Sequence, residues 1–153
     1  MFSLRGKAQL SQRTCAKNDL YLTAATNRRS VEEWKLDFEW LRVRHLVKDA
    51  MGRTDLPDLN SMLFLIGMQE VGQVRESFTK EEKQDLMHVA VCVLLTDDGY
   101  FEFTGMDADG WPHFKQVRPL DIKGVKAQEE LLKERVIQYL TAHLAENENT
   151  IEQ

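Results

Sequence analysis

The sequence has few of the residues that cross-link a small fold and no long apolar run of the kind that anchors a chain in a membrane. Its 153 residues include two cysteines and three prolines. By number and spacing, Cys15 and Cys92 exclude a disulfide framework and a CxxC metal site. The longest apolar runs, Met62 to Met68 and Val89 to Leu95, are far shorter than the roughly 18 residues that span a bilayer. We therefore predict no membrane segment, and a small buried residue at Cys92.

Common catalytic motifs are missing as well. The sequence contains no Gly-rich phosphate loop, no nucleophile elbow and no His-Glu-x-x-His element. It also lacks a continuous apolar stretch of signal-peptide length, so we expect a cytoplasmic protein. What is present, 42% hydrophobic and 29% charged residues, is typical of one globular domain with a single core.

The net charge of −5 is unevenly spread along the chain. Of 20 Lys/Arg and 25 Asp/Glu residues, six basic and one acidic residue fall in the first 30 positions, leaving 14 basic and 24 acidic residues for the rest. An acidic body disfavours nucleic-acid binding, because that affinity depends on cations that neutralise phosphates. We interpret residues 1–29 as a basic N-terminal arm.

Helix signals begin after this arm. A capping box at residues 30–33 opens a predicted first helix over residues 31–51, in which apolar residues recur at steps of three and four. Gly52 follows in the position of a left-handed C-cap. This helix has a broad apolar face, so we expect it to pack centrally.

Two further helices have equally local signals. Asp58 opens the second helix, in which Gly67 allows close packing and Gly72 ends the helix. A second capping box at residues 79–82 opens the third helix, which runs to about Leu95. We expect both helices to contribute to the core, because each contains an apolar run.

After the third helix the apolar period changes from 3.6 to 2, which predicts a β-hairpin at about residues 99–118. The Asp-rich turn at residues 107–110 resembles a calcium loop in part, but it lacks the remaining ligands and fits a hairpin turn better. A last helix over about 125–145 and a polar tail at 147–153 follow. The predicted fold is mainly α: a four-helix domain at residues 30–146, with the hairpin inserted between the third and fourth helices.

One candidate metal site consists of helical acids and a histidine, namely Glu70, Glu82, Asp85 and His88, with His45 as a further member. Asp85 and His88 share a helix face at i,i+3, as carboxylate and histidine ligands do in helical bundles. Glu82 and Asp85 resemble half of the magnesium signature of all-α nucleoside triphosphate pyrophosphohydrolases, but the other half is missing. A metal-dependent hydrolase with a divalent cofactor is therefore an alternative function, and no cofactor is otherwise predicted.

The aromatic cluster of the hairpin is the preferred functional surface. Tyr100, Trp111, His113 and Phe114 are its candidate ligand or partner residues, since one face of the hairpin covers the helices and the other is left for binding. The element order resembles winged-helix regulators, but the acidic third helix and hairpin tip disfavour DNA binding. We expect a non-enzymatic protein-interaction or dimerisation module, whose partner is a second copy of the chain or another protein.

Overall fold

The structure is a computed structural model that describes residues 32–151. The chain divides into two compact units, Met1–Phe38 and Glu39–Gln153. The predicted basic arm and Ser30, the residue that begins the first capping box, lie outside the described residues. The second unit holds the hairpin, the three labelled helices and the last part of the first helix.

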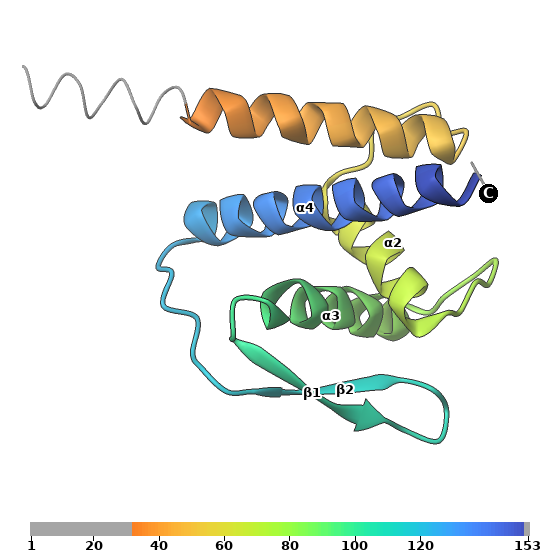
Figure 1. Ribbon diagram of the computed structural model, residues 1–153. Coiled ribbons are helices and arrows are strands. Elements are labelled where there is room, and N and C mark those ends of the chain that lie inside the picture. Colours follow the sequence, from red (N-terminus) through yellow and green to blue (C-terminus); the bar gives the residue numbers. More distant parts are fainter. Residues whose placement is uncertain (1–31, 152–153) are drawn as a thin grey trace, which may run out of the picture. The chain divides into compact units, whose positions relative to one another are not determined.

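The described chain has four helices and a two-stranded antiparallel hairpin, in the predicted order (Figure 1). Residues 32–50 are helical, and the other elements are α2 (Leu59–Val71), α3 (Lys80–Thr96), β1 (Phe101–Met106), β2 (Pro112–Gln116) and α4 (Val125–Ile151). The prediction of a mainly α fold, with a hairpin between the third and fourth helices, is confirmed. Within this described part, no helix is both long and apolar enough to cross a bilayer.

The helix ends follow the predicted capping signals. Asp58 caps α2 by accepting a hydrogen bond from the Ser61 amide at 2.8 Å, and Gly72 ends this helix with a left-handed φ of 71°. At the start of α3, the Glu82 amide donates to the Thr79 hydroxyl at 3.2 Å, and the Thr79 amide donates to the Glu82 carboxylate at 2.9 Å. This reciprocal capping box confirms where α3 begins.

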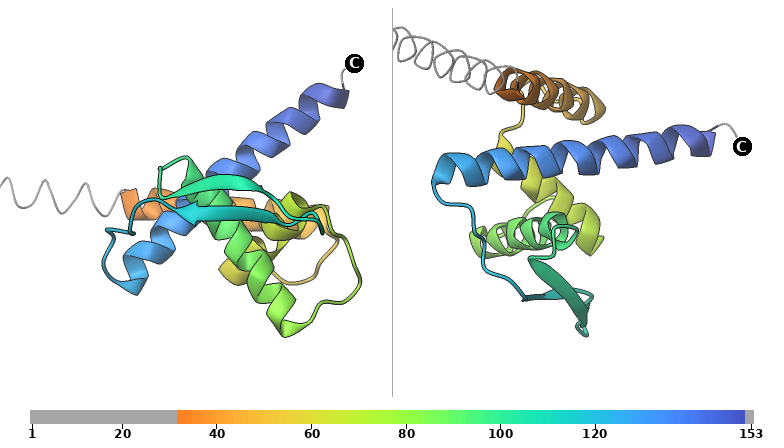
Figure 2. Two further views of the ribbon diagram at one scale, coloured as in Figure 1. Left: turned by 90° about the horizontal axis from the view of Figure 1, so that it is seen from below. Right: turned by 60° about the vertical axis from the view of Figure 1, so that its left-hand side comes forward.

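Helix α3 lies between α4 and the hairpin (Figure 1 and the right-hand view of Figure 2). It contacts α2, α4 and both strands. The core lies where the helices meet, and its least exposed members include Val43 of the first helix, Met62 of α2, Ala90 of α3 and Val136 of α4. Cys92 is also buried, as predicted. Apolar burial therefore holds the other elements around α3.

A glycine permits the closest helix contact. A Cβ atom built on Gly67 of α2 would lie 2.0 Å from the backbone oxygen of Leu86 in α3. No side chain tolerates that distance, and the backbone atom cannot rotate away. Residue 67 therefore has to be glycine for α2 and α3 to lie this close, which agrees with the predicted role of Gly67.

The hairpin turn is held by one carboxylate. An Asp107 oxygen, Oδ1, accepts hydrogen bonds from the amides of Asp109 and Trp111, each at 2.9 Å. The strand register shifts between Phe103 and Gly105, where Gly105 has a φ of 134°. The Asp-rich segment thus forms a side-chain-stabilised turn, as predicted in preference to a calcium loop.

Helix α4 begins at Val125, as predicted, but continues to Ile151. The sequence predicts an end near Ala145 and a polar tail at residues 147–153, and this end is placed too early. The segment after Ala145 contains no glycine or proline, so its backbone has no local signal to leave the helix. Polar composition alone does not predict the end of α4.

Replacing Gly67 with alanine should weaken the fold. Because the added methyl group would displace the Leu86 backbone, we expect Gly67→Ala to lower the free energy of unfolding by about 1–3 kcal/mol, the usual cost of overpacking. Urea denaturation measures this loss. Gln69→Ala, at an exposed position of the same helix, is the control and should change stability little; equal stability of the two variants would contradict the close approach.

The stabilisation provided by the hairpin turn should be lost at low pH. The amide of Trp111, the bonded His113 ring and the amide of Asp109 lower the pKa of Asp107 below its ordinary value of 3.8. The pKa of Asp107 is thus lower in the folded state than in the unfolded state. Ionised Asp107 therefore stabilises the fold at pH values above its unfolded-state pKa, and this stabilisation is lost as the pH falls through the lowered, folded-state pKa. Carboxyl NMR should show Asp107 titrating below 3.8. In His113→Ala the pKa should remain lowered, because the Trp111 amide has the largest effect.

Candidate functional site

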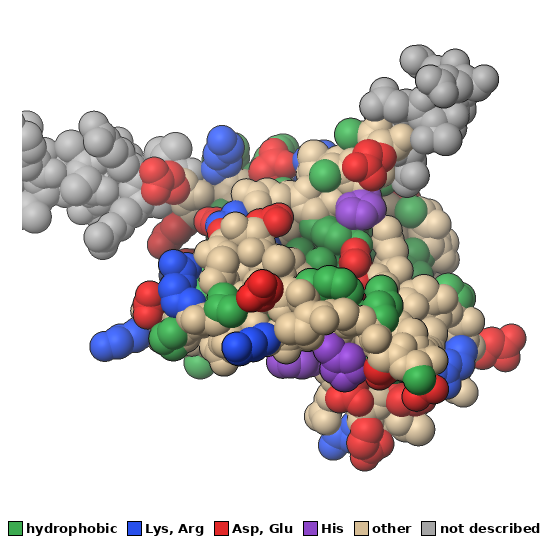
Figure 3. Space-filling view, turned by 60° about the horizontal axis from the view of Figure 1, so that its bottom comes forward, with side chains coloured by type: hydrophobic (Ala, Val, Ile, Leu, Met, Phe, Trp, Pro, Cys, Tyr) green, Lys and Arg blue, Asp and Glu red, His purple; other side chains and the backbone are tan. Residues whose placement is uncertain are grey.

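A cleft of about 580 Å³ lies among the ends of α2 and α3, the hairpin and α4. We call it the hairpin cleft; it is lined by Glu70, Val93, Leu94, Thr96, Asp97, Phe103, Met106, Pro112, Phe114, Arg135, Gln138, Tyr139, Ala142 and His143. On the face shown in Figure 3, apolar side chains gather in a central hollow, with acidic and histidine side chains at its border. A mostly apolar cleft with a few polar groups is typical of a binding site.

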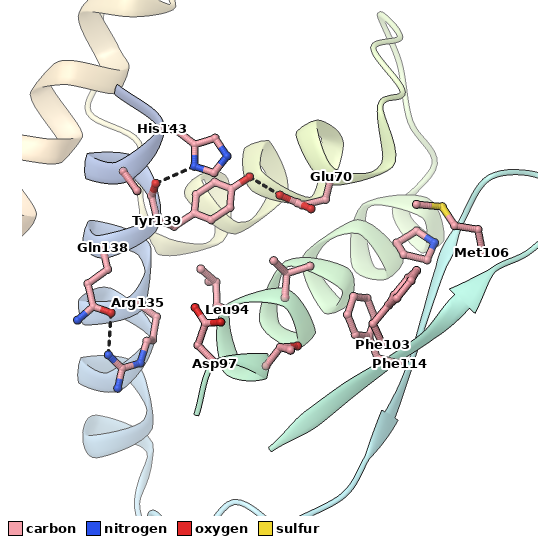
Figure 4. Close-up of a pocket in the computed structure, with 14 residues that line it drawn as sticks. Glu70, Leu94, Asp97, Phe103, Met106, Phe114, Arg135, Gln138, Tyr139 and His143 are labelled. Atoms are coloured by element: carbon pink, nitrogen blue, oxygen red, sulfur yellow. Dashed lines mark hydrogen bonds between the residues drawn. The ribbon is translucent and has the colours of Figure 1, made fainter. Parts of the chain in front are cut away.

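The hairpin supplies one wall of this cleft. Phe103 of β1 and Phe114 of β2 are partners in the strand register, and their rings meet edge to face with centroids 5.7 Å apart. Both rings face the cleft in Figure 4. Phe103 remains 51% exposed, and Met106, further along β1, remains 61% exposed. This wall is therefore apolar and open to solvent.

A polar cluster forms the opposite side. The Tyr139 hydroxyl of α4 donates to the Glu70 carboxylate of α2 at 2.5 Å, and the His143 ring stacks on Tyr139 with centroids 4.1 Å apart (Figure 4). Burial, together with the hydrogen bond to Glu70 and its charge, raises the pKa of Tyr139 well above its usual value. Tyr139 therefore keeps its proton and stays a hydrogen-bond donor to Glu70.

An ion pair fixes α4 next to the end of α3. Arg135 binds both carboxylate oxygens of Asp98, with Nε to Oδ2 at 2.6 Å and Nη2 to Oδ1 at 2.9 Å. Its remaining Nη1 donates to Gln138 at 2.8 Å. A bidentate pair of this kind holds both partners in one geometry. Arg135 thus lines the hairpin cleft with its charge already paired.

The structure separates the four predicted surface residues. Phe114 lines the hairpin cleft. Tyr100 is only 9% exposed and belongs to the core, with the Arg118 guanidinium 4.2 Å above its ring, so it cannot serve as an exposed contact. Trp111 and His113 lie outside the lining of the cleft. His113 is exposed and contacts Asp107 of the turn at 3.0 Å.

Three of the candidate metal ligands each contact a different partner. Glu70 binds Tyr139 and Glu82 closes the capping box, while His88 contacts the Cys92 thiol at 3.6 Å. Among residues 32–151, no group of three or more His, Cys, Asp or Glu side chains is arranged to hold a metal ion. The geometry therefore does not support the set of Glu70, Glu82, Asp85 and His88 as ligands of one metal.

The contact between His88 and Cys92 resembles a base next to a nucleophile. Cys92 is 1% exposed, and this burial raises the pKa of its thiol to about 11. The thiolate is the nucleophilic form of cysteine, so the thiol is unreactive near neutral pH. This contact is part of the packing of α3.

The polar cluster of the cleft does not follow from the sequence patterns. Periodicity assigns Tyr139 and His143 to one face of the last helix, and Glu70, near the end of the second helix, is predicted only as a candidate metal ligand. The i,i+4 spacing of Tyr139 and His143 is the one feature of the sequence that indicates that these two side chains lie together. Which face of α4 turns toward α2 depends on packing between helices that are distant in sequence.

Comparison with protein-family models, curated proteins and solved structures found no match to this chain. The geometry of the hairpin cleft is therefore the basis for the functional proposal.

The contact between Tyr139 and Glu70 should stabilise the fold. In Tyr139→Phe the half-buried Glu70 carboxylate loses its donor, so we expect the free energy of unfolding to fall by about 1–2 kcal/mol. Glu70→Gln should cost less, because the amide oxygen still accepts from the hydroxyl. Urea denaturation near neutral pH compares the two, and a larger loss in Glu70→Gln would contradict this arrangement.

Proposed function

We propose that this protein is a non-enzymatic interaction module that binds a partner protein in the hairpin cleft. The observation that carries the proposal is the open apolar wall, where Phe103 and Met106 are 51% and 61% exposed beside a cleft of about 580 Å³. Large apolar side chains grouped at a cleft are typical of contact surfaces, in which aromatic residues and methionine are enriched.

The openness of the cleft favours a protein over a small molecule. Small-ligand sites bury roughly 70–90% of the ligand surface. Here the hairpin wall is more than half exposed at Phe103 and Met106, so a small ligand would leave these side chains partly in water. A partner that lies across the hairpin and α4 would cover them.

A second copy of the chain is one form of this partner. The surface of α4 carries further exposed apolar side chains, Val125 at 81% and Leu144 at 40%. Stable interfaces bury about 800 Å² on each side, so the contact has to extend from the cleft onto neighbouring surfaces such as α4. A homodimer and a different partner protein both fit this requirement, and the same experiment distinguishes them.

Photo-crosslinking from the hairpin wall tests the proposal. We expect p-benzoylphenylalanine in place of Phe103 to form a protein adduct in cells, because a bound partner would lie against this side chain. Mass spectrometry of the adduct identifies the partner, and a peptide from the same chain would indicate the homodimer.

Two controls make the result specific to the cleft. The same photoreactive group at Val74, which is 91% exposed outside the cleft, should form no such adduct. Ala142→Trp, which places a large ring in the cleft, should prevent the adduct at position 103. Equal adducts at positions 74 and 103, or no effect of Ala142→Trp, would exclude the cleft as the contact surface.

A further inference from the structure

The charges of the hairpin cleft are unbalanced. Its lining contains two carboxylates, Glu70 and Asp97, and one cation, Arg135. Arg135 is paired with Asp98, which lies outside the lining, so its charge is not available to compensate the other two acids. An occupant of the cleft therefore meets net negative charge.

The free polar atoms of the cleft are mainly hydrogen-bond acceptors. Glu70 uses Oε1 to accept from Tyr139, and Oε2 has no hydrogen-bond partner among the described residues. His143 Nδ1 lies 2.9 Å from the Tyr139 carbonyl. A carbonyl only accepts, so the proton of a neutral ring is on Nδ1 and Nε2 is left as an acceptor. The Tyr139 hydroxyl already donates to Glu70, and the Arg135 guanidinium already donates to Asp98 and Gln138.

Two helix ends increase the negative potential. The last turns of α2 and α3 both border the cleft, through Glu70 and through Leu94 and Thr96. Neither last turn contains a basic residue. The C-terminal end of a helix carries a partial negative charge and stabilises nearby cations. The backbone therefore favours the same kind of occupant as the carboxylates do.

We infer that the hairpin cleft receives a lysine or arginine side chain of the partner protein, with a large apolar residue next to it in the partner's sequence. This inference rests on the proposed function, since it names the partner chemistry for that same cleft. The cationic group binds the Glu70 carboxylate, and the apolar neighbour packs on Phe103 and Phe114. Charge complementarity of this kind selects partners and speeds their association.

Matched peptides test the inference on the full chain. The probes are three capped pentapeptides of sequence Ser-Leu-X-Phe-Ser, in which X is lysine, norleucine or glutamate, titrated by ¹H–¹⁵N NMR. We expect the lysine peptide to shift the amide signals of cleft residues and to bind roughly tenfold more tightly than the norleucine peptide, since hydrogen bonds to charged groups contribute that much. The glutamate peptide should bind most weakly.

Variants locate the charge effect. Glu70→Gln should weaken binding of the lysine peptide roughly tenfold and leave the norleucine peptide unchanged. Glu81→Gln removes an equal charge from the first turn of α3, outside the cleft, and should change neither. Equal weakening by both substitutions would mean a general charge effect and would overturn the inference.

The outcomes also separate this inference from the proposed function. If lysine and norleucine peptides bind equally and Ala142→Trp abolishes both, the cleft is a contact surface but the cationic preference is wrong. Tighter binding of the glutamate peptide would likewise overturn the cationic preference. If Ala142→Trp leaves binding unchanged, or if no peptide shifts the cleft signals, the proposed contact surface fails together with the inference.

Discussion

The close approach of α2 to α3 at Gly67 is the constraint on which the rest of the structure depends. A Cβ atom at this position would lie 2.0 Å from the Leu86 backbone oxygen, so any larger residue separates the two helices. Glu70 near the end of α2 and Asp97 just after α3 both line the hairpin cleft. Helix α3 is also the element that both α4 and the hairpin contact (Figure 1).

Two side-chain contacts then position α4 against this pair. Tyr139 bonds to Glu70 of α2, and Arg135 forms a bidentate pair with Asp98 after α3. The hairpin has only two strands, which are marginal without support, and it packs on α3. Phe103 of the hairpin remains half exposed and lines the hairpin cleft together with residues of α4. The hairpin cleft is therefore the space left between two elements that are attached separately to α3.

Much of the fold could be predicted from the sequence, because its signals act over a few residues. Each helix cap supplies hydrogen bonds to backbone groups only a few residues away. This holds for the capping box at Thr79 and Glu82, for Asp58 and for Gly72. The end of α4 was predicted too early, since the residues after Ala145 are polar but helix-compatible. A polar composition does not specify where the backbone hydrogen bonds of a helix stop.

The sequence by itself determined the element order, the hairpin turn at Asp107 and the burial of Cys92, since each follows from local hydrogen bonding or local apolarity. Tertiary structure decided the candidate site. Tyr100 and Phe114 belong to one predicted aromatic cluster, yet Tyr100 is core and Phe114 lines the cleft. Glu70 and Tyr139 are 69 residues apart. They meet because of how α2 and α4 rotate as they pack, and the periodicity of either helix alone does not specify that rotation.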